Sequence, residues 1–246
     1  MWKRLPIPLL IAALALLVLP PVLLALGLTM TSAAEVVIFA MACMALNILV
    51  GHTGLVSFGH GAWFGLAAYA AALLQRNWMH GSFFLPTIAG VLIVTAVAAA
   101  FGFLILRRRG VYFSLLTLAL AAMLYAVSFR WTEVTGGENG LGGITRPALF
   151  GFNLESSTVY YWFVAAIAFL VLILLWRFHH STVGHVLVAI RENEQRARFL
   201  GYPTNRYKLA AFALSAGITG LAGILLLYQK GISEGGKAQS HSDLSD

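Results

Sequence analysis

The sequence predicts an all-α fold, a polytopic bundle of about seven transmembrane helices of which one is discontinuous. Three observations lead to this fold class: 60% of the 246 residues are hydrophobic, only 10% are charged, and the mean hydropathy is +0.84. Soluble domains carry about 25% charged residues, so this chain has too few polar groups to cover a water-facing surface. Its length suits a single membrane domain.

Seven segments are apolar enough to cross a bilayer core, which requires about 20 residues per helix. We predict spans at 7–28, 34–50, 58–75, 83–106, 111–130, 158–177 and 208–228. The first span follows two basic residues and could be confused with a signal peptide. It is too long for one, lacks a clear small-residue cleavage site, and contains Pro20-Pro21, where we expect a kink.

The basic residues predict the orientation of these spans. With the N-terminus in the cytoplasm, most of the 16 Lys and Arg fall in cytoplasmic segments: Lys3, Arg4, Arg107, Arg108, Arg109, Arg177, Arg191, Arg196, Arg198, Arg206 and Lys208. The positive-inside rule therefore predicts a cytoplasmic N-terminus and an external C-terminal tail. Because the net charge of +7 is spread over short loops between spans, it argues against a nucleic-acid partner.

The segment "GHTGLVSFGHGAWFG" (51–65) interrupts the apolar pattern with five glycines, two histidines, a serine and a threonine. It is a simple loop, a metal site or a broken helix. His52 and His60 have no Asp or Cys nearby to complete a ligand set, which argues against a metal. Irregular backbone at membrane depth survives only against protein or a water-filled path. We therefore favour a broken helix beside such a path, with Ser57 capping the helix that follows.

Polar residues inside membrane spans often mark pathways, and few occur here. The candidate translocation-path residues are Asn47, Ser57, Gly59, His60, Ser114 and Thr117. For Ser114 and Thr117 the alternative is structural: each hydroxyl would bond the backbone carbonyl one turn back in its own helix. The spans carry no mid-membrane carboxylate, which argues against a proton-coupled secondary transporter. The glycines of "AGITGLAG" (216–223) are expected to permit close helix packing.

Residues 183–200, "VGHVLVAIRENEQRARFL", predict an amphipathic cytoplasmic helix. Its apolar positions, which recur at helical spacing, are Val186, Ile190, Ala197 and Leu200. Gly201 and Pro203 form a normal stop signal. Such a helix lies on lipid headgroups or docks a cytoplasmic protein. The acidic Glu192 and Glu194 among the arginines favour docking, because specific protein contacts use both signs of charge.

Two glycine-rich segments outside the predicted spans, 135–143 and 231–238, are also candidates for function. The external stretch 135–143, "TGGENGLGG", contacts a binding protein, gates the outer mouth or is a flexible loop; its candidate residues are Gly136, Gly137, Asn139 and Gly140. The tail "GISEGGKA" (231–238) imitates a phosphate-binding loop. It follows an apolar span instead of a strand and has Ala238 where a hydroxyl is needed. We therefore expect any ATP to be bound by a partner.

Three segments together resemble the membrane subunits of branched-chain amino acid ABC importers of the LivM type. They are "LNILVGHTGLVSFGHGAWFGLAAYAAALL" (46–74), "GVYFSLLTLALAAMLYAVSFRWTEVTGGENGLGGI" (110–144) and "STVGHVLVAIRENEQRARFLGYPTNRYKLAAFALSAGITGLAG" (181–223). The resemblance covers almost everything from about 34 to 228. It implies an α-helical permease for branched-chain or other small amino acids, with no enzymatic chemistry, metal or cofactor of its own.

The resemblance also implies partners and a location. A second homologous permease subunit, two cytoplasmic ABC ATPase subunits and a periplasmic solute-binding protein would complete the complex in the bilayer of a bacterial inner membrane. Residues 183–201 match the family's cytoplasmic loop that contacts the ATPases. The residues assigned to this coupling are Ile190, Arg191, Glu192, Glu194, Arg198 and Gly201.

Several alternatives stay open. Closely similar permeases carry urea or other amides, so the solute class is open. Family members continue for two or three helices beyond the segment ending near 228, whereas here a polar tail follows. We therefore expect a permease domain at 1–228 and a disordered tail at 229–246, in a chain that looks truncated. A truncated, non-transporting remnant and, less favoured, a stand-alone secondary transporter are the other hypotheses.

Overall fold

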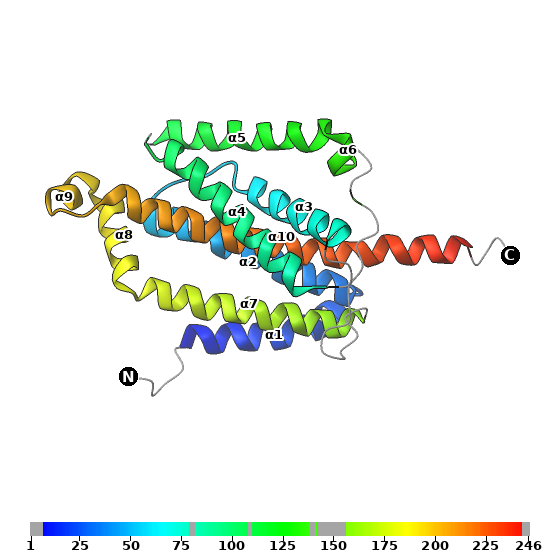
Figure 1. The fold of residues 1–246 in the computed structure, drawn as a ribbon. Helices are drawn as coiled ribbons and strands as arrows, with labels where there is room; N and C mark the ends of the chain where they lie inside the picture. The colour runs from blue at the N-terminus through cyan, green and yellow to red at the C-terminus, as the bar shows by residue number, and fades with distance from the viewer. Residues whose placement is uncertain (1–6, 79–81, 108–109, 138–140, 142–155, 243–246) are drawn as a thin grey trace.

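A computed structural model describes residues 7–78, 82–107, 110–137, 141 and 156–242. Every regular element in these ranges is a helix (Figure 1). In chain order the helices are α1 (Ile7–Ala25), α2 (Met30–Asn47), the π-helix η1 (Ile48–Thr53), α3 (Gly61–Asn77), α4 (Phe84–Ile105), α5 (Val111–Arg130), α6 (Thr132–Thr135), α7 (Ser157–His179), α8 (Thr182–Glu192), α9 (Glu194–Phe199) and α10 (Thr204–Ser242).

Six helices within the described ranges are long and apolar enough to cross a membrane. They are α1, α2 joined to η1, α4, α5, α7 and the Thr204–Gly231 part of α10. They correspond to six of the seven predicted spans and confirm a polytopic all-α bundle. The remaining predicted span, 58–75, corresponds to α3, whose 17 residues lie at the lower limit of the about 17–25 that a crossing takes. The helix is short because a non-helical stretch lies ahead of it.

α10 is the central helix of the bundle and packs against α2, α3 and α4. In its most apolar window 67% of the residues are buried, compared with 11% for α1. Small residues permit this packing, as predicted for 216–223. A Cβ atom on Gly223 would lie only 2.1 Å from the carbonyl oxygen of Phe64 in α3. The two backbones therefore approach each other as closely as glycine allows.

The helices α1 and α5 lie at opposite edges of the bundle and expose large apolar side chains (Figure 1). Leu14 of α1 is 61% exposed and Tyr125 of α5 is 70% exposed. α1 continues as one helix through Pro20 and Pro21. Apolar faces of this kind are costly in water but suit acyl chains or an apolar membrane partner.

The two ends of the bundle differ in charge. The start of α1, the turn between α4 and α5, and the helices α8 and α9 lie at one end, whereas α6 and the C-terminus lie at the other (Figure 1). The first end carries most of the described basic residues that the sequence places in the cytoplasm, including Arg107, Arg177, Arg191 and Lys208. Lys3, Arg4, Arg108 and Arg109 lie outside the described residues. We refer to this end as the basic end.

The last helix differs from the prediction. The sequence predicts a span ending at 228 and a disordered tail from 229, but α10 continues to Ser242. No proline occurs between Thr204 and Ser242 to remove a backbone donor. The glycines in this stretch weaken a helix by about 1 kcal/mol each relative to alanine and do not forbid it.

Candidate functional site

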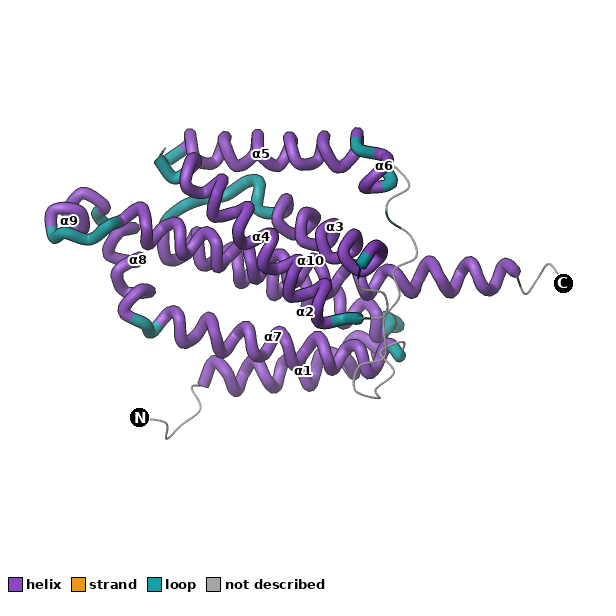
Figure 2. Tube along the Cα trace, viewed as in Figure 1, coloured by secondary structure: helices purple, strands orange, loops and turns teal. Residues whose placement is uncertain are grey.

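The predicted break in the helical pattern is present. α2 passes into η1, and the hydroxyl of Thr53 donates to the Leu49 carbonyl at 2.6 Å. Gly54 ends the turn with a φ of +68°, a conformation that side-chain-bearing residues rarely adopt. Residues 54–60 are then non-helical until α3 begins at Gly61 (Figure 2). We call 54–60 the crossing loop, because it carries the chain from the basic end of the bundle to the start of α3.

The crossing loop is attached to α5 by two hydroxyls. Ser114 donates to the carbonyl of Val56 at 2.6 Å, and Thr117 accepts from the backbone N–H of Phe58 at 3.2 Å. Thr117 also donates to the Ser114 carbonyl within α5 at 2.8 Å, as the alternative interpretation of the sequence expected. The Ser114 hydroxyl instead donates its hydrogen bond to the crossing loop and not to its own helix. These two predicted path residues therefore satisfy backbone groups of an irregular segment between two apolar helices.

Gly59 allows the crossing loop to lie directly against α5. A Cβ atom at this position would be 1.9 Å from the carbonyl oxygen of Thr117. No side chain can be accommodated at that distance without movement of one backbone. The glycine is therefore required by close approach and not by an unusual dihedral angle.

His60 attaches the other side of the loop to α10. Its Nε2 lies 2.8 Å from the Thr219 hydroxyl and 3.1 Å from the Ser215 hydroxyl. Ser215 in turn donates to the carbonyl of Ala45 in α2. The sequence analysis missed Ser215 and Thr219, which lie in the predicted span 208–228 and were not assigned a role. Their spacing of four places both hydroxyls on one helix face, a signal that could have identified them.

The crossing loop also contains polar atoms with no partner in the described part of the chain. The Ser57 hydroxyl and Nδ1 of His60 are buried and make no hydrogen bond there. The prediction that Ser57 caps α3 is wrong, because the helix begins four residues later and His60 occupies the cap position without a side-chain bond. Buried polar groups of this kind generally meet water or a ligand.

A groove of about 430 Å³ lies between α3 and α5, next to the end of the crossing loop. Gly61 and Gly65 of α3 form part of its wall, and Tyr125 and Ser128 of α5 form another part. None of the described residues that line it carries a charge. The groove therefore suits an uncharged or apolar group better than an ion.

The remaining predicted path residue, Asn47, and the other histidine of the segment, His52, do not join this site. Asn47 is exposed at the end of α2. His52 shares a hydrogen bond of 2.9 Å with His179, so the two histidines of the segment face different partners. In the external segment, Gly136 and Gly137 adopt positive φ angles of 76° and 57° after the short helix α6. Asn139 and Gly140 lie outside the described residues.

The predicted cytoplasmic helix 183–200 is two helices, α8 and α9, which meet at Asn193. Asn193 leaves the helical conformation with φ −154° and ψ 95°, and its side chain accepts from the backbone N–H of Arg196 at 2.9 Å. This local bond competes with helix continuation and caps α9. Val186, Ile190 and Ala197 are buried as predicted, whereas Leu200 is 69% exposed. Gly201 ends α9 with a φ of +88°, which confirms the stop signal.

The carboxylate of Glu194 forms ion pairs and a hydrogen bond with residues of this chain. It bonds Lys208 at 2.7 Å and Arg198 at 2.9 Å, and accepts from the Thr204 hydroxyl at 3.3 Å. The side chains of Glu194 and Lys208 are only 14% and 7% exposed. These contacts join α9 to the start of α10. The enclosed carboxylate of Glu194 is less available to a partner than the side chain of Arg198, which is 46% exposed; a docking role for either residue stays a prediction.

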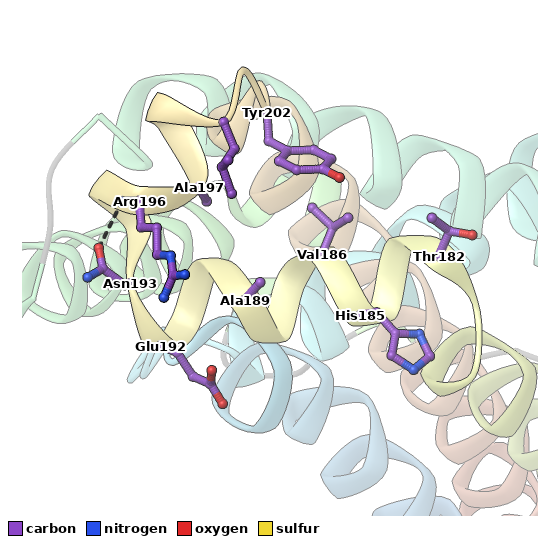
Figure 3. A pocket seen from close by; sticks show the side chains of 10 residues that line it. Thr182, His185, Val186, Ala189, Glu192, Asn193, Arg196, Ala197 and Tyr202 are labelled. Atoms are coloured by element: carbon purple, nitrogen blue, oxygen red, sulfur yellow. Dashed lines mark hydrogen bonds between the residues drawn. The ribbon is translucent and has the colours of Figure 1, made fainter.

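Glu192 and Arg196 are exposed and border a groove of about 570 Å³ between α8 and α9 (Figure 3). In Figure 3 the Tyr202 ring lies on the side of Val186, while His185 and Glu192 project from the other side of α8. The groove therefore has an apolar floor and charges of both signs at its rim. Such a surface matches the anatomy of a specific protein interface.

Arg191 and Ile190 point toward the rest of the bundle. Ile190 is buried, and the Arg191 guanidinium donates to the carbonyl of Gly51 in η1. A Cβ atom on Gly54 would lie 2.9 Å from Cγ of Arg191. The helix α8 therefore contacts the start of the crossing loop directly.

Comparison with known proteins places these features in a family. A family model described as "Branched-chain amino acid transport system / permease component" matches residues 28–236. The chain is 33% identical to the high-affinity branched-chain amino acid transport system permease protein LivM of Escherichia coli, over 90% of this chain and 57% of that protein. It is 31% identical to LivM of Salmonella typhimurium, over 79% and 51%.

A second kind of relative also matches. The autoinducer 2 import system permease protein LsrC of an Enterobacter species is 29% identical over 70% of this chain and 48% of that protein. The chain spans about half the length of the curated relatives it matches. No solved structure matches it significantly.

Proposed function

Because this chain belongs to the family of branched-chain amino acid transport system permease components, we propose that it forms part of a solute path in an ABC importer. Membership makes the chain a multi-pass membrane permease component and not an enzyme. The observation that supports the path most directly is the crossing loop, an irregular segment whose Ser57 and His60 carry buried polar atoms without a partner in the described residues, and which we place at membrane depth. Such backbone requires protein or water beside it.

The solute that we propose is a branched-chain or other small amino acid. The family description and the two LivM relatives name branched-chain amino acids, and the described lining of the groove between α3 and α5 is uncharged. An uncharged groove suits an aliphatic side chain, while the crossing loop offers hydroxyl and imidazole groups for polar ends. The LsrC relatives are named for autoinducer 2 import, so membership of the family does not fix the solute. Urea or another amide, which similar permeases carry, is the second candidate solute.

We propose a partner for each end of the bundle and for the exposed apolar faces at its two edges. The basic end would face the cytoplasm of a bacterial inner membrane, with the N-terminus inside. Two ABC ATPase subunits are proposed, and one of them would bind in the groove between α8 and α9. The exposed faces of α1 and α5 would meet lipid and a second homologous permease subunit, and a periplasmic solute-binding protein would deliver the solute at the other end.

Transport in this scheme requires two conformations. Each nucleotide state of the ATPases must favour one conformation through different contacts at α8 and α9, because a ligand shifts an equilibrium only by its differential affinity. The attachment of the crossing loop to both α5 and α10 means that relative movement of these helices would change the loop. Opening of the path would then alternate between the two sides.

The test is uptake of labelled leucine and of labelled urea by cells that carry the complete set of transporter genes, with and without this chain. We expect ATP-dependent leucine uptake to be lost when the chain is removed and restored when it is supplied again. Loss of urea uptake instead would assign the second solute class. Uptake of both solutes that is unchanged by removal of the chain would contradict the proposed function.

A further inference from the structure

We propose that Arg191 and the π-helix η1 form the internal link through which movement of α8 reaches the crossing loop. The inference rests on the proposed function, because it assumes that partner ATPases move α8. It changes the role expected for Arg191 from a contact with the ATPase to a positioning residue that acts on Gly51 and Gly54 of this chain.

The link has two contacts at the basic end of the bundle. Arg191 of α8 donates to the carbonyl of Gly51, and its aliphatic stem covers Gly54. Next to this contact, Nδ1 of His179 lies 2.9 Å from Nε2 of His52. His179 is the last residue of α7 and is followed directly by the turn into α8. The second half of η1 is therefore held by the segment that carries the proposed docking surface.

The apolar side of α8 keeps this geometry fixed. Leu187 and Ile190 are buried, with 0% and 2% of their surfaces exposed. α8 packs directly on η1. Interiors packed at this density transmit displacement instead of absorbing it. A shift of α8 would therefore carry Gly51 and Gly54 with it.

The other side of η1 continues into the crossing loop. The Thr53 hydroxyl bonds the Leu49 carbonyl and accepts from the backbone N–H of Leu55 at 3.3 Å, which joins the π turn to the loop. From there Ser114, Thr117 and His60 hold the loop against α5 and α10. The contacts are thus continuous from α8 to the helices beside the proposed path.

A π turn is suited to this role. It closes hydrogen bonds between residues i and i+5, one residue more than the α-helix, and is frequent at functional sites. Conversion of the turn to α-helical bonding would shift every following residue of the crossing loop by one position. The structure shows the π arrangement, and a change to α-helical bonding is the movement that we propose for this link.

The experiment uses the complete transporter in proteoliposomes, with ATP hydrolysis and leucine uptake measured on the same preparation. We expect Arg191→Gln to co-purify and hydrolyse ATP like the native complex but to transport about tenfold less solute per ATP, the loss expected for one charge-assisted hydrogen bond. Arg191→Lys is expected to recover part of the ratio. Arg206→Gln, which removes an exposed charge from the same end, is the matched control and should leave the ratio unchanged.

A second variant keeps the test decisive if Arg191→Gln does not fold. His52→Leu breaks the other contact and is expected to lower the same ratio. An unchanged ratio in the folded variants would overturn the inference. Co-purification and hydrolysis that fall in proportion to uptake would return Arg191 to the role of an ATPase contact. Absence of ATP-driven uptake in the native complex would instead defeat the proposed function, which separates the two failures.

Discussion

Replacement of Gly59 by alanine is expected to lower solute uptake by the complete transporter about tenfold or more. The added Cβ would lie 1.9 Å from the carbonyl oxygen of Thr117, which belongs to the backbone of α5 and cannot rotate away. The clash must displace the crossing loop, α5 or both. The Ser114 and Thr117 bonds to the loop would then be lost together. Overpacking of this kind costs about 1–3 kcal/mol or more, and we expect a fall in uptake of about tenfold or greater.

The control for this variant is Gly61→Ala. A Cβ at Gly61 has no neighbour within 4 Å, although it lies only two residues from Gly59. Because Gly61 lines the groove between α3 and α5, this control is read in the amount of folded complex, which should stay within about twofold of native since alanine is favoured over glycine in a helix. Equal uptake by Gly59→Ala and the native chain would show that the close approach to α5 is not required for transport.

Replacement of Gly223 by alanine is expected to prevent assembly of the bundle itself. Gly223 lies in α10, the most buried helix among the candidate spans, and its Cβ would sit 2.1 Å from the Phe64 carbonyl oxygen. Because α10 also packs against α2 and α4, a displacement would spread beyond α3. We expect the free energy of unfolding to fall by about 1–3 kcal/mol or more, a large share of the about 5–15 kcal/mol that holds a native protein together, and the amount of folded protein extracted in mild detergent to fall with it.

Gly65→Ala is the matched control for Gly223→Ala. Gly65 follows Phe64 in the same helix and has no neighbour within 4 Å of a built Cβ. Monodisperse protein should be recovered in native amounts, as measured by size-exclusion chromatography. A normal yield from Gly223→Ala with the same elution volume would contradict the proposed tight contact between α3 and α10.

The membrane fold could be predicted because it depends on composition and length. Spans of about 20 apolar residues and basic loops are read directly from the sequence. The break at 51–65 could also be predicted, since five glycines cannot be explained by a continuous apolar helix. The stop at Gly201 follows from the same local chemistry of glycine and proline.

The details of the site depend on tertiary contacts that the sequence does not reveal. Glu194 resembles Glu192 in the sequence, yet only Glu194 is enclosed by Lys208 and Arg198. The split at Asn193 reflects one side-chain bond that competes with the helix. Ser215 and Thr219 acquire a role only because the crossing loop brings His60, more than 150 positions earlier, to their face of α10.

The central claim, that the crossing loop borders a water-accessible solute path, is tested most directly by thiol labelling. This sequence has a single cysteine, Cys43, so a Cys43→Ala background leaves no other thiol in it, and labelling is measured on this chain after the subunits are separated. Ser57→Cys places a thiol in the loop, and Leu92→Cys places one on an exposed face of α4 as a lipid-facing control. The complete transporter is treated with a charged, water-soluble thiol reagent in each nucleotide state, with and without saturating leucine.

The account predicts that the thiol introduced by Ser57→Cys reacts in at least one nucleotide state and that leucine slows this reaction, while the thiol introduced by Leu92→Cys does not react. A Ser57→Cys variant that still transports leucine, but whose thiol stays unreactive in every nucleotide state, would contradict it.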